Sequence, residues 1–145
     1  MRYTVRVPMR WSDMDAYGHV NNVVFLQYFE MARVDLFFER ASLEERTGLR
    51  RGTVVASHQI AYKLPVVYSP QPLEVQIWVS DVRAAAFTCH YEAFDHGQLA
   101  VTGSTLLVPF DFSINRPRRL TPDEKEFLAR WTDEPAVDPG TGGES

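Results

Sequence analysis

The stretch from about residue 21 to residue 40 constrains the fold most, because it has helical periodicity and is apolar over most of its surface. One narrow stripe of this helix holds Phe25, Tyr28, Phe29, Ala32 and Leu36. Much of the opposite side is also apolar, through Met31, Val34, Phe37 and Phe38. A helix this apolar has to be covered by other elements. We therefore expect a sheet to wrap around it.

The remainder of the chain predicts mainly β structure. Residues 2–11 alternate, with Tyr3, Val5, Val7, Met9 and Trp11 on one face. Further strands are predicted over 53–64, 73–83, 86–94 and 98–109, with a hairpin turn at 95–97. Thr121 and Pro122 open a short helix that carries Phe127, Leu128 and Trp131 inward. This order predicts an α+β domain: an antiparallel sheet of about five strands around one long central helix, with a short C-terminal helix.

Length and composition set limits on the class of protein. A chain of 145 residues forms one domain, which we place at 1–131, and the Pro- and Gly-containing segment 132–145 is expected to be a disordered tail. The net charge of −4 gives no attraction for nucleic acid or an anionic membrane. A lone cysteine, Cys89, fits a reducing compartment, and no apolar run is long enough for a membrane span. We expect a cytoplasmic protein.

Residues 11–33 carry the chemistry. Asp13 and Asp15 lie on a tight turn that contains Gly18 and leads directly into the apolar helix. The free N–H groups of a helix N-terminus suit a developing oxyanion, while a carboxylate beside them can attack a carbonyl or activate water. The pattern D-x-D-x-x-G-H-V-N-N, followed by Tyr28, Glu30 and Arg33, resembles the 4-hydroxybenzoyl-CoA thioesterase family of hot-dog folds. The resemblance covers most of residues 3–130.

The resemblance implies an acyl-CoA thioesterase that releases free acid and CoA. Asp15 would be the nucleophile or the general base, a choice that the sequence leaves open. The backbone N–H near Asn22 would be the oxyanion donor, and Gly18 and His19 would help to position the substrate. No metal and no cofactor beyond the CoA of the substrate is implied. Family members pair into dimers with continuous sheets and active sites at the subunit interface, so we expect a homodimer or a dimer of dimers.

Further residues are candidates for contacts with the substrate, but a purely structural role would explain them equally well. Candidate substrate contacts are Tyr17, Ser57 and His58, although His58 could be an ordinary core histidine. Candidates for CoA-phosphate binding are Arg83 and, in the positive cluster 115–119, Arg116 and Arg118. That cluster could also be a solvated linker, and three alanines follow Arg83 where related enzymes carry basic residues.

Alternatives remain for single residues and for the whole chain. Asp13 is best interpreted as a capping or turn residue, and Glu30 with Arg33 as a salt bridge, with Glu30 the alternative catalytic base. Cys89 alternates among apolar residues, and neither G-x-S-x-G nor H-E-x-x-H occurs, which disfavours Ser, Cys or zinc-protease mechanisms. The alternatives are an acyl-carrier-protein thioesterase, a non-catalytic acyl-CoA-binding module, which an intact Asp15 disfavours, and a hydratase, which the lack of a His between residues 22 and 57 disfavours.

Overall fold

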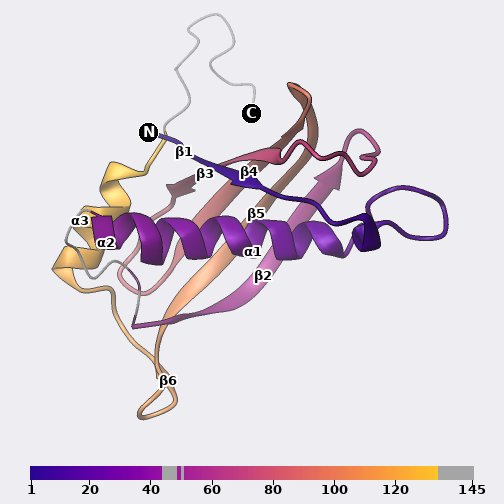
Figure 1. The fold of residues 1–145 in the computed structure, drawn as a ribbon. Helices are drawn as coiled ribbons and strands as arrows, with labels where there is room; N and C mark the ends of the chain where they lie inside the picture. The colour runs from indigo at the N-terminus through magenta and orange to yellow at the C-terminus, as the bar shows by residue number, and fades with distance from the viewer. Residues whose placement is uncertain (44–48, 50, 134–145) are drawn as a thin grey trace, which may run out of the picture.

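The computed structural model describes residues 1–43, 49 and 51–133. Figure 1 shows the long helix lying across a curled sheet. The strands are β1 (Tyr3–Val7), β2 (Thr53–Tyr62), β3 (Leu73–Ser80), β4 (Phe87–Asp95), β5 (Gln98–Asp111) and β6 (Arg116–Pro117). The helices are a 3₁₀ turn (Trp11–Asp13), α1 (Val24–Val34), a π-helical continuation (Asp35–Arg40), α2 (Ala41–Leu43) and α3 (Pro122–Arg130).

The sheet is antiparallel throughout, with the strand order β1-β3-β4-β5-β2, and β6 pairs with β5. This arrangement confirms the predicted fold class, the hot-dog fold. It also confirms the hairpin between β4 and β5, where His96 and Gly97 both have positive φ, as a two-residue turn of this kind requires. The β6 strand was not predicted.

The long helix confirms the predicted apolar stripe, since Phe25, Tyr28, Phe29, Ala32 and Leu36 are all buried against the sheet. The expectation that its opposite side is also covered is wrong for the single chain. Met31 and Val34 are 45% and 48% exposed, because the sheet curls around one side of the helix only. Leu36 and Phe37 are adjacent and both buried. They lie in the π-helical segment, whose wider turn changes which side chains face the sheet.

The β2 strand forms one edge of the sheet, and most of its residues are exposed. A register shift between Val55 and Ser57 also interrupts its alternation. By contrast, β3 and β4 lie inside the sheet and alternate strictly between buried and half-buried side chains. Cys89 is fully buried there and burial raises the pKa of its thiol to about 12, so it is a core residue.

Both ends of the described chain depart from expectation in small ways. β1 ends at Val7, and Trp11 is 72% exposed rather than on a buried face. At the other end, Thr132 pairs with Val79 of β3 and Asp133 binds Arg2, so ordered chain continues beyond residue 131. The remainder of the predicted tail, residues 134–145, lies outside the described residues.

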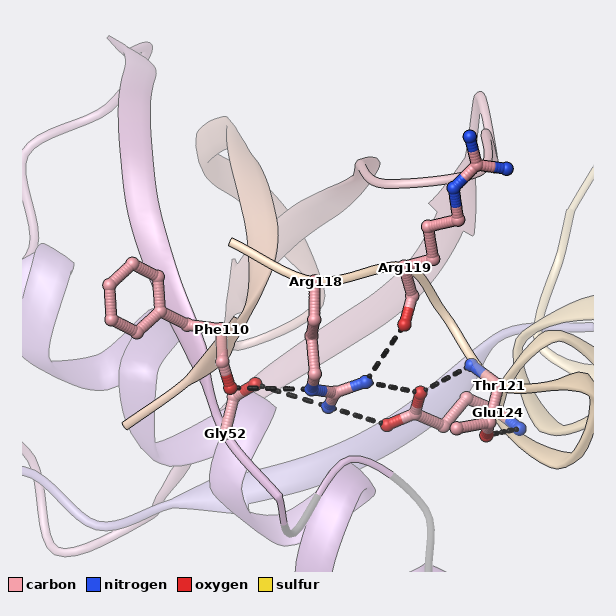
Figure 2. Close-up of polar contacts among 6 residues, drawn as sticks. All are labelled: Gly52, Phe110, Arg118, Arg119, Thr121 and Glu124. Atoms are coloured by element: carbon pink, nitrogen blue, oxygen red, sulfur yellow. Dashed lines mark hydrogen bonds and ion pairs between the residues drawn. The ribbon is translucent and has the colours of Figure 1, made fainter. Parts of the chain in front are cut away.

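The α3 helix begins as predicted and is anchored by a buried ion pair. Thr121 accepts a hydrogen bond from the Glu124 N–H at 3.1 Å, and the Glu124 carboxylate accepts one from the Thr121 N–H at 2.7 Å, which together form a capping box. Figure 2 shows Arg118 holding both oxygens of that carboxylate, at 2.7 and 2.8 Å. Its guanidinium also donates to the carbonyls of Gly52, Phe110 and Arg119. Arg118 is therefore engaged in holding the fold, contrary to the expectation that it contacts CoA phosphate.

Candidate active site

The Asp15 turn is a closed loop between two paired residues. Met14 and Val20 form an isolated antiparallel bridge. Within it, the Asp15 N–H donates to the His19 carbonyl at 2.9 Å and the Gly18 N–H donates to the Asp15 carbonyl at 3.0 Å. Gly18 has φ +77°, a conformation that costs other residues energy. One Asp15 carboxylate oxygen accepts the Tyr17 N–H at 2.9 Å, so backbone geometry orients this half-buried carboxylate.

The start of the helix leaves one backbone donor free beside this turn. The Asn21 side chain accepts the Val23 N–H at 2.9 Å, and the Asn21 main-chain carbonyl accepts the Val24 N–H at 3.0 Å, so Asn21 stabilises the turn that leads into α1, whose N-cap residue is Val23. Asn22 follows, and its N–H has no acceptor among the described residues. The Tyr62 hydroxyl donates to the Asn22 carbonyl at 2.8 Å. An unpaired N–H at the positive end of a helix is suited to an oxyanion.

An open pocket of about 500 Å³ joins the turn to the helix start. Its walls are held together by a hydrogen bond of 2.7 Å from the Val20 N–H to the Val66 carbonyl. One wall comes from the turn and α1, with Asp15, Tyr17, His19, Val20, Asn22 and Phe25; the other follows the end of β2, with Tyr62, Lys63, Leu64, Pro65 and Val66. The structure thus brings Asp15, Tyr17, His19 and Asn22 into one pocket with Gly18 on the same turn.

Tyr62 and Lys63 were not identified from the sequence. They lie some forty residues from the motif and belong to a stretch that alternates like any strand, so no local signal distinguishes them. Only the pairing of β2 with β5, together with the contact between Val20 and Val66, brings them to the helix start.

The first acid of the motif, Asp13, has a structural role, in agreement with its interpretation from the sequence as a capping or turn residue. Asp13 is 4% exposed and accepts hydrogen bonds from the Tyr28 hydroxyl at 2.6 Å and from the Arg10 N–H at 3.0 Å. Burial alone would raise the pKa of Asp13, but these hydrogen bonds and the Arg10 charge outweigh it and lower the pKa. Asp13 stabilises the 3₁₀ turn and Tyr28 rather than capping α1.

Several predicted residues lie away from the pocket. Ser57 faces the outer side of the sheet beside Thr88 and Leu106. His58 is exposed on the inner side, with Nδ1 at 2.9 Å from the Thr105 hydroxyl, so it is not a core histidine. Neither residue lines the Asp15 pocket within one chain.

The predicted phosphate-binding arginines are at the other end of the sheet. Tyr62, at the pocket, pairs with Val101 of β5, whereas the opposite end of β2 pairs with Pro109. Arg116 follows β5 on β6, beyond Pro109. Arg83 lies in the β3–β4 turn, which contacts the linker before α3 through the hydrogen bond from Leu120 to Ala84.

Glu30 and Arg33 contact each other only loosely. Their closest charged atoms are 3.8 Å apart, and the buried Arg33 guanidinium donates instead to the Tyr91 hydroxyl at 3.0 Å. Glu30 points outward from α1 beside Met31 and Val34, away from the Asp15 pocket. Within one chain the structure therefore places Asp15, and not Glu30, in the same pocket as Asn22.

Among the described residues, no three His, Cys, Asp or Glu side chains are grouped to hold a metal ion. None of the helices in this part of the chain has the length and apolar character needed to cross a membrane.

Comparison with known proteins assigns the family. The model of the thioesterase-like superfamily matches residues 9–131. The uncharacterized protein YsmA of Bacillus subtilis is 32% identical over 124 residues, covering 85% of this chain and 82% of its own.

Two solved structures share the fold. A thioesterase from Thermus thermophilus, complexed with coenzyme A and Zn, has a TM-score of 0.75 and 28% identity and covers 91% of this chain and 95% of its own. A DHNA-CoA thioesterase from Staphylococcus aureus has a TM-score of 0.74 and 27% identity and covers 89% of each chain. The chain therefore belongs to the thioesterase-like superfamily, and it is a thioester hydrolase with the hot-dog fold.

Proposed function

We propose that this protein hydrolyses an acyl-CoA to the free acid and CoA, with Asp15 as the reacting carboxylate. The observation that carries the proposal is that Asp15 lines the same open pocket as Asn22, whose N–H has no acceptor among the described residues. The CoA-bound thioesterase of Thermus thermophilus and the DHNA-CoA thioesterase of Staphylococcus aureus support a CoA ester as the substrate class.

The reaction needs little more than these two groups. The thioester carbonyl accepts a nucleophile, either the Asp15 carboxylate itself or a water that Asp15 deprotonates. The carbonyl oxygen becomes an oxyanion, which the Asn22 N–H and the positive end of α1 stabilise. As the carbonyl reforms, the carbon–sulfur bond breaks and CoA leaves as a thiolate. On the nucleophilic route, water then hydrolyses the mixed anhydride and regenerates Asp15.

The test is thiol release from a panel of aliphatic, branched and aromatic acyl-CoAs. Asp15→Asn keeps the size of the side chain but removes its charge, so kcat should fall by about 10²–10⁴-fold. Glu30→Gln is the matched comparison, since Glu30 is the alternative base. Near-normal turnover by Asp15→Asn would contradict the assignment. A loss confined to Glu30→Gln would transfer the role to that residue.

We further propose a homodimer formed through the edge of β2. This strand is ten residues long, mostly exposed, and its outer edge has no partner strand among the described residues. If two copies pair antiparallel about a two-fold axis, the start of one β2 lies beside the end of the other. Arg83 and Arg116 of one chain would then approach the Asp15 pocket of its partner.

A wild-type protein that hydrolyses no CoA ester would favour the two other interpretations. Release of acid from an acyl carrier protein would identify a carrier-protein thioesterase. Tight binding of acyl-CoA without turnover would identify a binding module.

A further inference from the structure

Among the described residues, Lys63 is the only lysine or arginine that lines the Asp15 pocket. It follows the last residue of β2, and its position is fixed by the backbone. The Lys63 N–H donates to the Ala100 carbonyl at 2.8 Å, and the Leu64 N–H donates to the same carbonyl at 3.1 Å. The side chain therefore extends from a rigid corner of the sheet rather than from a free loop.

The ammonium group of Lys63 has no carboxylate partner in the part of the chain that the structure describes. Asp15, the acid in the same pocket, already accepts hydrogen bonds from the Tyr17 N–H and, at 3.5 Å, from the Asn21 amide. Lys63 is thus an unneutralised positive charge on the wall of a pocket, in a chain whose net charge is −4. Such a charge raises the local concentration of anions at the pocket.

We propose that Lys63 binds an anionic group of the substrate in the pocket where Asp15 reacts. The inference rests on the proposed function and extends it to substrate recognition. Two parts of an acyl-CoA can carry such an anion: a phosphate of CoA, or a carboxylate on the acyl group. Either would form a charge-assisted hydrogen bond with the ammonium group. Within the described residues of one chain Lys63 is the only lysine or arginine at this pocket, because Arg83 and Arg116 lie at the far end of the sheet.

The chain offers a matched control, since Lys63 and Lys125 are its only two lysines. Lys125 is exposed on α3 and lines no part of the Asp15 pocket. Lys63→Met should raise KM about ten-fold for the affected substrates, as expected for losing a hydrogen bond to a charged group. Lys125→Met should leave KM unchanged. Lys63→Arg keeps the charge and should restore KM to within about three-fold of wild type.

Three substrates distinguish the two anions: pentanoyl-CoA, glutaryl-CoA and the N-acetylcysteamine thioester of pentanoate. If Lys63 binds a CoA phosphate, Lys63→Met raises KM for both CoA esters and spares the N-acetylcysteamine thioester, which has no phosphate. If it binds an acyl carboxylate, KM rises for glutaryl-CoA alone. Identical KM values for Lys63→Met and Lys125→Met on all three substrates would overturn the proposal.

A second measurement does not depend on hydrolysis. Trinitrobenzenesulfonate modifies lysine amines, and peptide mass spectrometry follows each lysine separately. CoA or glutaryl-CoA should slow modification of Lys63 in the wild-type protein and leave Lys125 unaffected. Equal rates with and without both compounds would overturn the Lys63 site even if Asp15-dependent hydrolysis is intact. Protection of Lys63 without any hydrolysis would keep the site and overturn the proposed reaction instead.

Discussion

At the scale of single residues, the two acids of the motif have different environments although only one residue separates them in the sequence. Asp13 points into the protein, where Tyr28 and Arg10 satisfy its carboxylate. Asp15 lies beyond the bridge between Met14 and Val20, at the wall of the open pocket. A buried and fully hydrogen-bonded carboxylate stabilises a turn, whereas a carboxylate facing a pocket is available for chemistry.

Tyr62 is the residue that ties the end of β2 to the helix start. Its hydroxyl donates to the Asn22 carbonyl, and its ring meets Phe25 edge-on at 6.0 Å. Burial raises the pKa of Tyr62, so the hydroxyl stays protonated and remains a donor at neutral pH. We infer that this bond orients Asn22, the residue whose N–H we assign to the oxyanion.

Replacing Tyr62 by Phe tests that role. The ring is retained and one neutral hydrogen bond is lost, so kcat should fall about 2- to 10-fold with little change in KM. Steady-state thiol release measures both constants. Tyr68→Phe is the control, because Tyr68 lies outside the pocket. If the two variants have the same kcat, the Tyr62 hydroxyl does not position the site.

At the scale of elements, the Arg118–Glu124 pair connects three parts of the chain. Arg118 reaches the carbonyls of Gly52 before β2 and of Phe110 in β5, while Glu124 belongs to the first turn of α3. Both side chains are buried, at 9% and 1% exposure. Removing one partner would leave the other charge buried without compensation, which is costly.

The same pair predicts a loss of stability in acid. Burial alone would raise the pKa of Glu124, but hydrogen bonds from Arg118 and Thr121 outweigh it and hold the pKa below its ordinary value of 4.5. The pair therefore contributes fully above pH 4.5 and is lost as the pH falls through the folded-state pKa. Glu124→Gln should lower the free energy of unfolding at pH 7 by about 3–5 kcal/mol, measured by urea denaturation.

Two further variants make that experiment decisive. Glu39→Gln removes an exposed carboxylate and should change the free energy of unfolding by less than about 0.5 kcal/mol. The double variant Arg118→Met/Glu124→Met leaves no unpaired charge and should be more stable than Glu124→Gln alone. A Glu124→Gln protein as stable as Glu39→Gln would show that the pair does not hold α3 to the sheet.

At the scale of the whole molecule, the exposed β2 edge predicts association. Sedimentation equilibrium should give twice the chain mass of 16.6 kDa. If the partner completes the site, activity per chain should fall when dilution separates the subunits. Asp15→Asn should sediment like wild type, because its pocket lies at the end of β2 and not along its edge. A fully active monomer would contradict the proposed dimer.

The fold could be predicted where interactions between residues close in the sequence determine the local structure. The alternation in 73–83 and 86–94 correctly predicted two inner strands, and the Asp95-His96-Gly97 turn correctly predicted the hairpin between β4 and β5. Thr121 and Pro122 likewise placed the start of α3. The errors occurred where the local sequence pattern does not match the environment of the residue in the folded protein. Trp11 and His58 both continue an alternating pattern, yet one leaves its strand and the other lies on an edge that no described part of the chain covers.

The sequence by itself determined most of the elements, their order, the acid-bearing turn and the helix that follows it, because side-chain periodicity, capping and turn preferences act between near neighbours. Only the tertiary structure decided which residues share the pocket. It joined Lys63 and Tyr62 to Asp15 through the Val20–Val66 contact. It also placed Arg83 and Arg116 away from that pocket and paired Arg118 with Glu124. Contacts between distant segments follow from strand pairing and register, which no local stretch of sequence encodes.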